Sequence, residues 1–165
     1  MEGQIIVRPI GWVRSPRKGK ADDFWGDVES LIELDGARFG PDSVLGLAEF
    51  SHLEVVFHLD QVPEDSVSTG TRHPRGRVDW PEVGIFAQRA KARPNRIGVS
   101  RCRLLRVEGT RLVVEGLDAI DGTPVLDVKP WIDAFGPLGA VRQPAWATEL
   151  MRDYYARGRA VPPTA

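Results

Sequence analysis

The chain has 165 residues, enough for one domain with a buried core, and its hydrophobic (42%) and charged (27%) fractions are ordinary for a soluble globular protein. No apolar run is long enough to cross a bilayer, and the N-terminus lacks a signal-peptide pattern. The net charge of -1 hides an asymmetry, because nine Arg and one Lys between residues 72 and 106 face only Asp79 and Glu82. That segment therefore carries about +8 and the remainder about -9, which is typical of a local surface for an anionic ligand such as phosphate.

The first third of the chain predicts two strands and a loop. Residues 4–13 are β-rich, and Pro9 within them favours an edge or bulged position. Residues 14–16 end this strand, and a charged loop follows to Asp27. Phe24 and Trp25 are aromatic in this polar setting; they either pack back onto the core or stack on a ligand. Residues 28–34 alternate as a second strand, which the Asp35-Gly36 turn closes.

The middle of the chain contains a short helix, a buried strand and a long loop. Pro41 stands at a favourable first helical position for residues 41–47. The apolar run 55–57 marks a buried strand within residues 52–62. Residues 63–79 are polar and rich in Arg, Gly and Pro, and a loop of that length in a compact domain tends to be functional or mobile.

The second half predicts four more strands and one helix. The strands are expected at residues 83–87, 98–107, 111–115 and 125–128, with a hairpin through Gly109-Thr110. Trp146, Leu150 and Tyr154 recur every four residues, so residues 144–155 should form an amphipathic helix. Residues 157–165 form an expected disordered tail. Many short strands with little helix indicate an all-β barrel, which we expect to form a single domain over residues 1–156.

The segment from Arg89 to Ser100 is the most distinctive feature. Four basic residues surround a Pro94-Asn95 break, and Gly98 leads into an apolar run. Proline fixes its own φ and disfavours helix at the preceding residue, so this segment should be a shaped loop. It either binds an anion or is a solvated surface turn.

Several common chemistries lack support in the sequence. No Gly-x-Gly-x-x-Gly follows a strand and no P-loop is present, which argues against those nucleotide sites. His52, His58 and His73 lack metal-ligand spacing, so no metal is expected, and satisfied core or rim histidines are the simpler interpretation for the first two. Cys102 has no nearby base in the sequence and suits a small strand residue better than a nucleophile. One cysteine forms no internal disulfide, which favours a cytoplasmic location.

Two aspartates flank a turn near the end of the predicted strands. Asp118 and Asp121 enclose Ala119-Ile120, and Gly122 would let a ligand approach the backbone closely. The structural alternative for Asp121 is turn capping through an Asx hydrogen bond.

Five blocks of sequence, in order, resemble the TsaA/TrmO family. They are Pro9–Pro16, Phe50–Leu53, Gly84–Arg89, Arg93–Ser100 and Asp118–Pro130. The resemblance covers about residues 5–135. It implies a single-sheeted β-barrel methyltransferase that uses S-adenosyl-L-methionine, forms a homodimer with the cofactor near the subunit interface, and methylates N6 of threonylcarbamoyladenosine beside the anticodon of tRNA.

Carried over position by position, the resemblance implies a set of site residues. Cofactor contacts are expected at Asp60, Gln61, Arg89, Val99, Ser100, Asp118, Asp121, Gly122, Thr123 and Pro124. The basic loops would hold tRNA phosphates through Arg72, Arg75, Arg77, Arg93 and Arg96, because such contacts position nucleic acid rather than specify its sequence. No general base is evident from the sequence; His52 or a carboxylate are both candidates.

Two departures from the family pattern leave alternatives open. Family members often have proline where Arg96 stands, and many bacterial members carry a second, C-terminal domain that we expect this chain to lack, because it ends soon after the predicted helix. A methyltransferase acting on another acceptor and a non-catalytic RNA-binding barrel are the alternatives.

Overall fold

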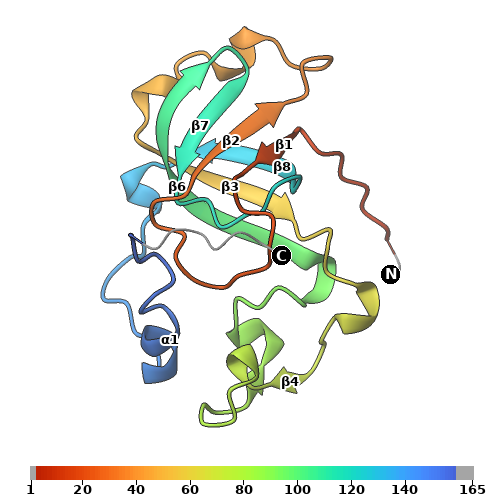
Figure 1. Ribbon diagram of the computed structural model, residues 1–165, viewed down its shortest axis with the longest axis vertical. Coiled ribbons are helices and arrows are strands. Elements are labelled where there is room, and N and C mark those ends of the chain that lie inside the picture. Colours follow the sequence, from red (N-terminus) through yellow and green to blue (C-terminus); the bar gives the residue numbers. More distant parts are fainter. Residues whose placement is uncertain (1–2, 159–165) are drawn as a thin grey trace. The chain divides into compact units, whose positions relative to one another are not determined.

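The computed structural model describes residues 3–158. Within them, six strands close an antiparallel barrel in the order β1-β2-β7-β6-β3-β8 (Figure 1). Their bounds are Gly11–Arg14 (β1), Glu29–Leu34 (β2), His52–His58 (β3), Ile97–Glu108 (β6), Arg111–Glu115 (β7) and Pro124–Pro130 (β8). A separate two-stranded sheet pairs β4 (Thr71–Arg72) with β5 (Val83–Gly84). The predicted all-β barrel is confirmed.

The barrel closes because its strands alternate in the expected way. Val13 on β1, Ile32 on β2 and Val55 on β3 are fully buried, and their neighbours along each strand are more exposed. Each such side chain contributes about 1.5–3 kcal/mol by leaving water. In Figure 1, β2 lies between β1 and β7, in agreement with its pairing register.

Helical structure is sparse in residues 3–158. One α-helix, α1 (Ala145–Leu150), accompanies seven short 3-10 turns. These turns are Pro41–Val44, Leu47–Glu49, Glu64–Ser66, Pro74–Gly76, Ile85–Ala87, Pro94–Arg96 and Asp133–Phe135. No helix among the described residues has the length and apolar character needed to span a membrane.

The chain divides into two compact units. We call Met1–Phe57 with Val99–Ala165 the barrel unit, and His58–Gly98 the insert unit. The insert unit contains the β4-β5 sheet and most of the basic segment, and five acidic residues offset its seven Arg and Lys. Whether residues 1–156 act as one domain stays a prediction.

Several predicted elements are shorter than expected. The first strand begins at Gly11 rather than residue 4, because Pro9 has no N–H to donate and residues 3–8 are exposed. The strand predicted at 83–87 ends at Gly84, and a 3-10 turn begins at Ile85. The helix predicted at 41–47 becomes two 3-10 turns separated by Leu45 and Gly46, of which Gly46 has φ 81°. Other boundaries, including the hairpin at Gly109-Thr110, are confirmed within a few residues.

The C-terminal region differs most from its prediction. The α-helix ends at Leu150 instead of residue 155. Beyond it the chain continues in turns, with Arg152 and Tyr154 donating to the carbonyls three residues before them, and the carbonyls of Asp153 and Tyr154 accept hydrogen bonds from the backbone of Phe24 and Trp25. Arg157 and Gly158, predicted to be disordered, are held by Glu115 and Asp27. The rest of the predicted tail, residues 159–165, lies outside the described residues.

Candidate functional site

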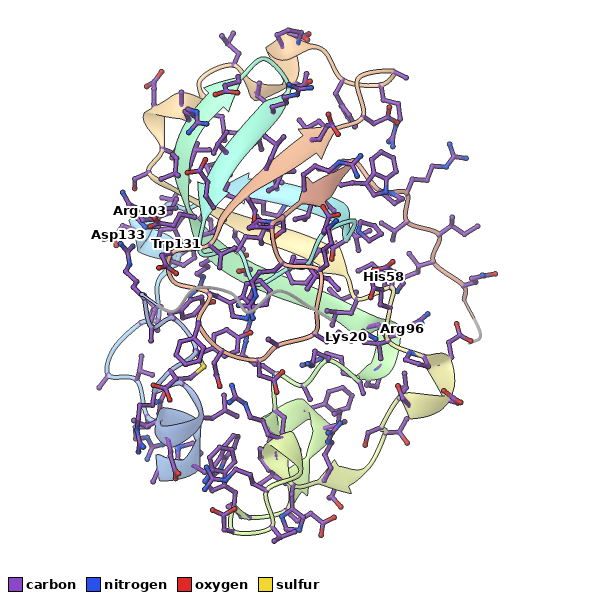
Figure 2. All side chains as sticks on the ribbon, in the orientation of Figure 1. Lys20, His58, Arg96, Arg103, Trp131 and Asp133 are labelled. Carbon is purple, nitrogen blue, oxygen red and sulfur yellow. The ribbon has the colours of Figure 1, made fainter. Side chains whose placement is uncertain are left out.

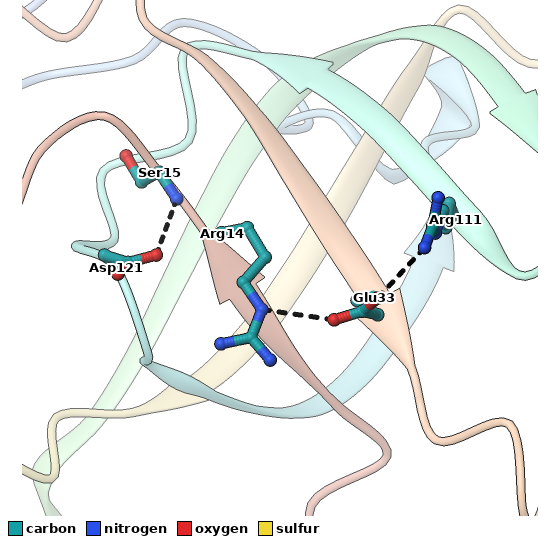
Figure 3. A network of polar contacts seen from close by, with 5 residues as sticks. All are labelled: Arg14, Ser15, Glu33, Arg111 and Asp121. Carbon is teal, nitrogen blue, oxygen red and sulfur yellow. Dashed lines mark hydrogen bonds and ion pairs between the residues drawn. The ribbon is translucent and has the colours of Figure 1, made fainter.

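The segment from Asp118 to Thr123 is fastened to the end of β1. Asp121 Oδ1 accepts a hydrogen bond from the backbone of Ser15 at 3.0 Å (Figure 3), and the Asp121 N–H donates to the Arg17 carbonyl at 2.8 Å. Thr123 is buried, and its carbonyl accepts from Val13 at 3.0 Å. Asp121 thus acts as a cap across the fold, 106 residues away from its partner, rather than within its own turn.

Gly122 is required by its backbone conformation. Its φ is 81°, in the left-handed region that favours glycine, and its N–H donates to the Val13 carbonyl at 2.8 Å. No atom beyond its chain neighbours lies within 4 Å of the position that a Cβ would take. The space beside this backbone is therefore open, as a close ligand approach requires.

Two buried oxygen atoms in the barrel unit stand out. Among the described residues, Ser100 Oγ and Asp118 Oδ1 are the buried side-chain polar atoms without a hydrogen-bond partner. An unsatisfied buried polar group costs about 1–3 kcal/mol, so each such atom needs an explanation, and a bound ligand is one. Both atoms belong to residues predicted to contact the cofactor.

Cys102 lies on the same strand as Ser100 and is influenced by the charge of Asp118. Ser100 and Cys102 are two residues apart on β6 and share its buried face. Burial, and secondarily the charge of Asp118, raise the pKa of the Cys102 thiol to about 12. The thiol therefore stays protonated near neutral pH, which supports the interpretation of Cys102 as a packing residue rather than a nucleophile.

The other oxygen of Asp118 is held from the C-terminal segment. The Tyr154 hydroxyl donates to Asp118 Oδ2 at 2.5 Å. Burial is the main cause that raises the pKa of Tyr154, followed by the charge of Asp118. The sequence pattern places Tyr154 only on an amphipathic helix, because nothing in a local pattern points to a carboxylate 36 residues away.

The insert unit gathers a second group of predicted residues around the Pro94–Arg96 turn. The Arg96 carbonyl accepts from the Leu59 N–H at 2.8 Å, and its guanidinium donates to the Val62 carbonyl at 2.8 Å. These contacts hold Asp60 and Gln61, which lie between Leu59 and Val62, against the turn. Arg96 adopts φ 51°, a conformation that the proline common in the family at this position cannot adopt.

Gln88 organises the neighbouring part of the insert unit. Its buried side-chain amide donates to the carbonyls of Arg72 and Val83, both at 2.9 Å. The backbone carbonyl of Gln88 accepts a hydrogen bond from the Arg93 guanidinium at 2.9 Å. The basic segments containing Arg72, Arg89 and Arg93 are therefore joined through one residue whose role no local sequence pattern indicates.

Ion pairs neutralise part of the positive charge of the basic segment, residues 72–106. Arg77 pairs with Asp79, and the guanidinium of Arg96 (labelled in Figure 2) lies 3.1 Å from Glu64. On the barrel unit the pairs are Arg101–Glu54, Arg103–Glu115 and Arg106–Glu108. The predicted linear cluster of charge is thus reduced by folding, and the segment from Arg89 to Arg96 remains free of acidic residues in the sequence.

Aromatic and histidine residues have mostly structural partners. Trp25 is buried, and the Arg17 guanidinium carbon lies 3.7 Å from the centre of its ring. Of the two alternatives expected for this aromatic pair, Trp25 therefore packs onto the core. His52 Nδ1 contacts Ser51 Oγ at 2.8 Å, and His58 is half-buried. Over residues 3–158, no group of three or more His, Cys, Asp or Glu side chains could hold a metal ion.

Comparison with known proteins identifies the family. The tRNA-methyltransferase O N-terminal domain family (TrmO_N) matches residues 14–136. The chain belongs to this family. TrmO_N therefore covers both the Asp118–Pro124 segment and the Pro94–Arg96 turn, whereas Tyr154 lies beyond it.

Individual relatives extend the comparison. The chain is 37% identical over 140 residues to a probable S-adenosyl-L-methionine-binding protein of Methanothermobacter thermautotrophicus, covering 82% of this chain and 96% of that protein. It is 39% identical over 137 residues to the mouse tRNA (adenine(37)-N6)-methyltransferase, covering 79% of this chain and 31% of the mouse protein.

Solved TrmO structures share the fold. A TrmO from Pseudomonas aeruginosa has a TM-score of 0.71 and 29% identity, with 88% of this chain and 63% of that chain covered. The chain thus spans slightly less than two thirds of that TrmO.

Proposed function

We propose that this chain is an S-adenosyl-L-methionine-dependent methyltransferase that modifies N6 of threonylcarbamoyladenosine in tRNA. Membership of TrmO_N supports the reaction class, and the mouse relative's name supports a tRNA adenine as the acceptor. The structural observation that carries the cofactor assignment is the pair of buried, unpartnered oxygens on Ser100 and Asp118.

The residues present fit this cofactor. S-adenosyl-L-methionine carries an ammonium group, ribose hydroxyls and an adenine amino group, all of which donate hydrogen bonds. A buried hydroxyl and a buried carboxylate oxygen are suitable acceptors, and the open backbone at Gly122 admits a close approach. Asp118 is the stronger of the two aspartates for this role, because Asp121 Oδ1 already caps Ser15.

The protein's part in the reaction is to bind and align. When bound, S-adenosyl-L-methionine would supply a methyl group activated by its sulfonium: the N–CH3 bond would replace the S–CH3 bond, the demethylated cofactor would leave, and the N6 proton would pass to water or a base. Asp118 and Ser100 would orient the cofactor, with Val99, Thr123 and Pro124 beside them along β6 and at the start of β8. Asp60, Gln61 and Arg89 of the insert unit stay predicted cofactor contacts.

The basic residues of the insert unit supply the proposed tRNA contacts. Arg72, Arg75, Arg77, Arg93 and Arg96 are the candidates, and of these Arg77 and Arg96 also pair with Asp79 and Glu64. Phosphate contacts by arginine make binding salt-dependent without reading sequence. We further propose a cytoplasmic homodimer. The reduced, buried Cys102 and the family resemblance support this assignment, and light scattering of the purified chain tests the dimer.

The experiment measures cofactor binding first and methyl transfer second. Titration calorimetry with S-adenosyl-L-methionine should show saturable binding, weakened about 10- to 100-fold in Asp118→Asn, because a hydrogen bond to a charged group contributes about 1.5–3 kcal/mol. Asp127→Asn is the control, since Asp127 pairs with Lys129 at the surface. tRNA lacking the modification is then incubated with protein and cofactor and its nucleosides are analysed by mass.

The outcomes separate the candidate functions. A new methyl group on threonylcarbamoyladenosine supports the full proposal. Cofactor binding without that product moves the acceptor elsewhere. Salt-sensitive RNA binding without cofactor binding overturns the proposal in favour of an RNA-binding barrel.

A further inference from the structure

The C-terminal segment Asp153–Gly158, which we call the strap, is fastened to the loop that precedes β2. The backbone N–H groups of Phe24 and Trp25 donate to the carbonyls of Asp153 and Tyr154, at 2.9 and 2.8 Å. Farther along, the Gly158 N–H donates to Asp27 Oδ2 at 2.9 Å, and Arg157 pairs with Glu115 at 2.6 Å. The strap is therefore bonded at several points along its length to residues 24–27 and to Glu115 on β7.

The loop beneath the strap is built for this contact. A Cβ on Gly26 would lie 2.0 Å from the Tyr155 carbonyl oxygen, so only glycine permits the strap to approach so closely. Trp25 is buried, and Arg17 stacks on its ring while donating to the Asp23 and Phe24 carbonyls at 2.8 and 3.2 Å. The loop is thus fixed from within, and the strap rests on a rigid surface.

The strap delivers one polar group to the candidate cofactor site. Tyr154 donates its hydroxyl to Asp118 Oδ2, and Asp118 Oδ1 is left buried without a partner among the described residues. A carboxylate with one oxygen bound has a fixed orientation, so its second oxygen has a fixed direction. The pKa of Tyr154 is raised by burial first and then by Asp118, Tyr155 and Asp22, so the phenol remains a donor at neutral pH.

We propose that Tyr154 is a positioning residue for Asp118, and that the strap brings it to the cofactor site from outside the TrmO_N region. This inference rests on the proposed function, because it assigns Asp118 Oδ1 to a donor group of S-adenosyl-L-methionine. Residues 14–136 match the family, so Tyr154 is a contribution of this chain's C-terminal segment. Its role is to fix the carboxylate before the cofactor arrives, which reduces the ordering cost of binding.

The first test compares two tyrosine variants. Tyr154→Phe keeps the ring and removes the hydroxyl, and Tyr155→Phe is the matched control, because Tyr155 is the adjacent, partly exposed ring with its centroid 5.0 Å away. Calorimetry with S-adenosyl-L-methionine should give a dissociation constant about 10-fold higher for Tyr154→Phe and unchanged for Tyr155→Phe. In an Asp118→Asn background, Tyr154→Phe should have a much smaller effect, because the two residues act as a pair.

The second test needs no cofactor. The chain has two tyrosines, so Tyr155→Phe leaves Tyr154 as the sole phenol. Its ultraviolet titration should show no ionisation at the pH where an exposed tyrosine ionises, and adding Asp118→Asn should lower its pKa. Arg17, whose charge also acts on Tyr154, is left unchanged throughout.

The two tests distinguish the possible failures. If the wild-type chain binds the cofactor and Tyr154→Phe binds it equally well, the positioning role is overturned while the proposed function stands. If the phenol titration is unchanged by Asp118→Asn, the pairing itself is wrong. If the titration behaves as expected but the wild-type chain binds no cofactor, the proposed function has failed and the inference fails with it.

Discussion

Substitution of Gly26 by alanine should detach the strap from the loop before β2. The new Cβ would lie 2.0 Å from the Tyr155 carbonyl oxygen and 2.8 Å from its carbonyl carbon, both backbone atoms that no side-chain rotation can move. An ordinary contact begins at 3.4 Å, so the strap must shift by about 1.4 Å. A displacement of this size would break the hydrogen bonds from Phe24 and Trp25, which are 2.9 and 2.8 Å long.

The expected loss of stability follows from the hydrogen bonds that this shift would break. Two backbone hydrogen bonds contribute about 1–3 kcal/mol together, and the bond from Tyr154 to the Asp118 carboxylate contributes about 1.5–3 kcal/mol. Because part of the strap can relax, we expect Gly26→Ala to lower the free energy of unfolding by about 2–4 kcal/mol. Affinity for S-adenosyl-L-methionine should fall about as much as in Tyr154→Phe.

Urea denaturation and amide hydrogen exchange measure these effects. Gly36→Ala is the control, because no atom lies within 4 Å of its added Cβ and its φ is outside the left-handed region. Its unfolding free energy should change by less than about 0.5 kcal/mol. If Gly26→Ala is as stable as this control, and the amides of Phe24 and Trp25 exchange no faster, the inferred attachment of the strap is wrong.

Three further predictions concern stability. Between pH 9 and 10 the free energy of unfolding should fall by up to about 1.4 kcal/mol per pH unit, because the Cys102 thiol ionises near its ordinary pKa of 9.0 when unfolded but near 12 when folded. Tyr154, whose pKa is also raised in the fold, adds to this slope above pH 10. Cys102→Ala should flatten the slope between pH 9 and 10 in urea denaturation, and equal slopes there would contradict the assignment. Arg96→Pro should lower the free energy of unfolding of the insert unit by about 3 kcal/mol and speed hydrogen exchange of the Leu59 amide, because proline cannot adopt the φ of 51° found at Arg96. Arg96→Gly can keep this φ and should have a smaller effect. Equal effects of the two variants would refute the backbone argument. Leu53→Ala, which creates a cavity in the barrel core, should cost about 2–5 kcal/mol, while Leu45→Ala at an 89% exposed site should be near neutral by the same measurement.

Sequence patterns predicted the barrel well because strand alternation is a local property. The buried positions of β1, β2 and β3 follow the period of two that the residues display, and the β6-β7 hairpin turns at Gly109-Thr110 as expected. Strand boundaries were predicted less accurately where a segment has no neighbouring strand to pair with. Residues 4–10 have β-forming side chains, but strand pairing begins only at Gly11.

In the candidate site, too, some features were predictable from the sequence and others are shown only by the fold. Sequence blocks identified Ser100 and Asp118, but only the fold shows that an oxygen of each is buried without a partner. Likewise, charge counting found the basic segment, while folding paired Arg101 and Arg103 with acidic residues 47 and 12 positions away. Local composition cannot specify such pairs, because the partner is chosen by strand register.

The sequence by itself therefore determined the strands, the turns and the identity of the motif residues, since periodicity and backbone preference act over a few neighbouring positions. The tertiary structure alone decided that Tyr154, expected on an amphipathic helix with Trp146 and Leu150, instead reaches Asp118 across 36 residues. The physical reason is that the carbonyls of Asp153 and Tyr154 are bonded by the backbone of Phe24 and Trp25, a contact between segments far apart in the sequence that no local pattern encodes.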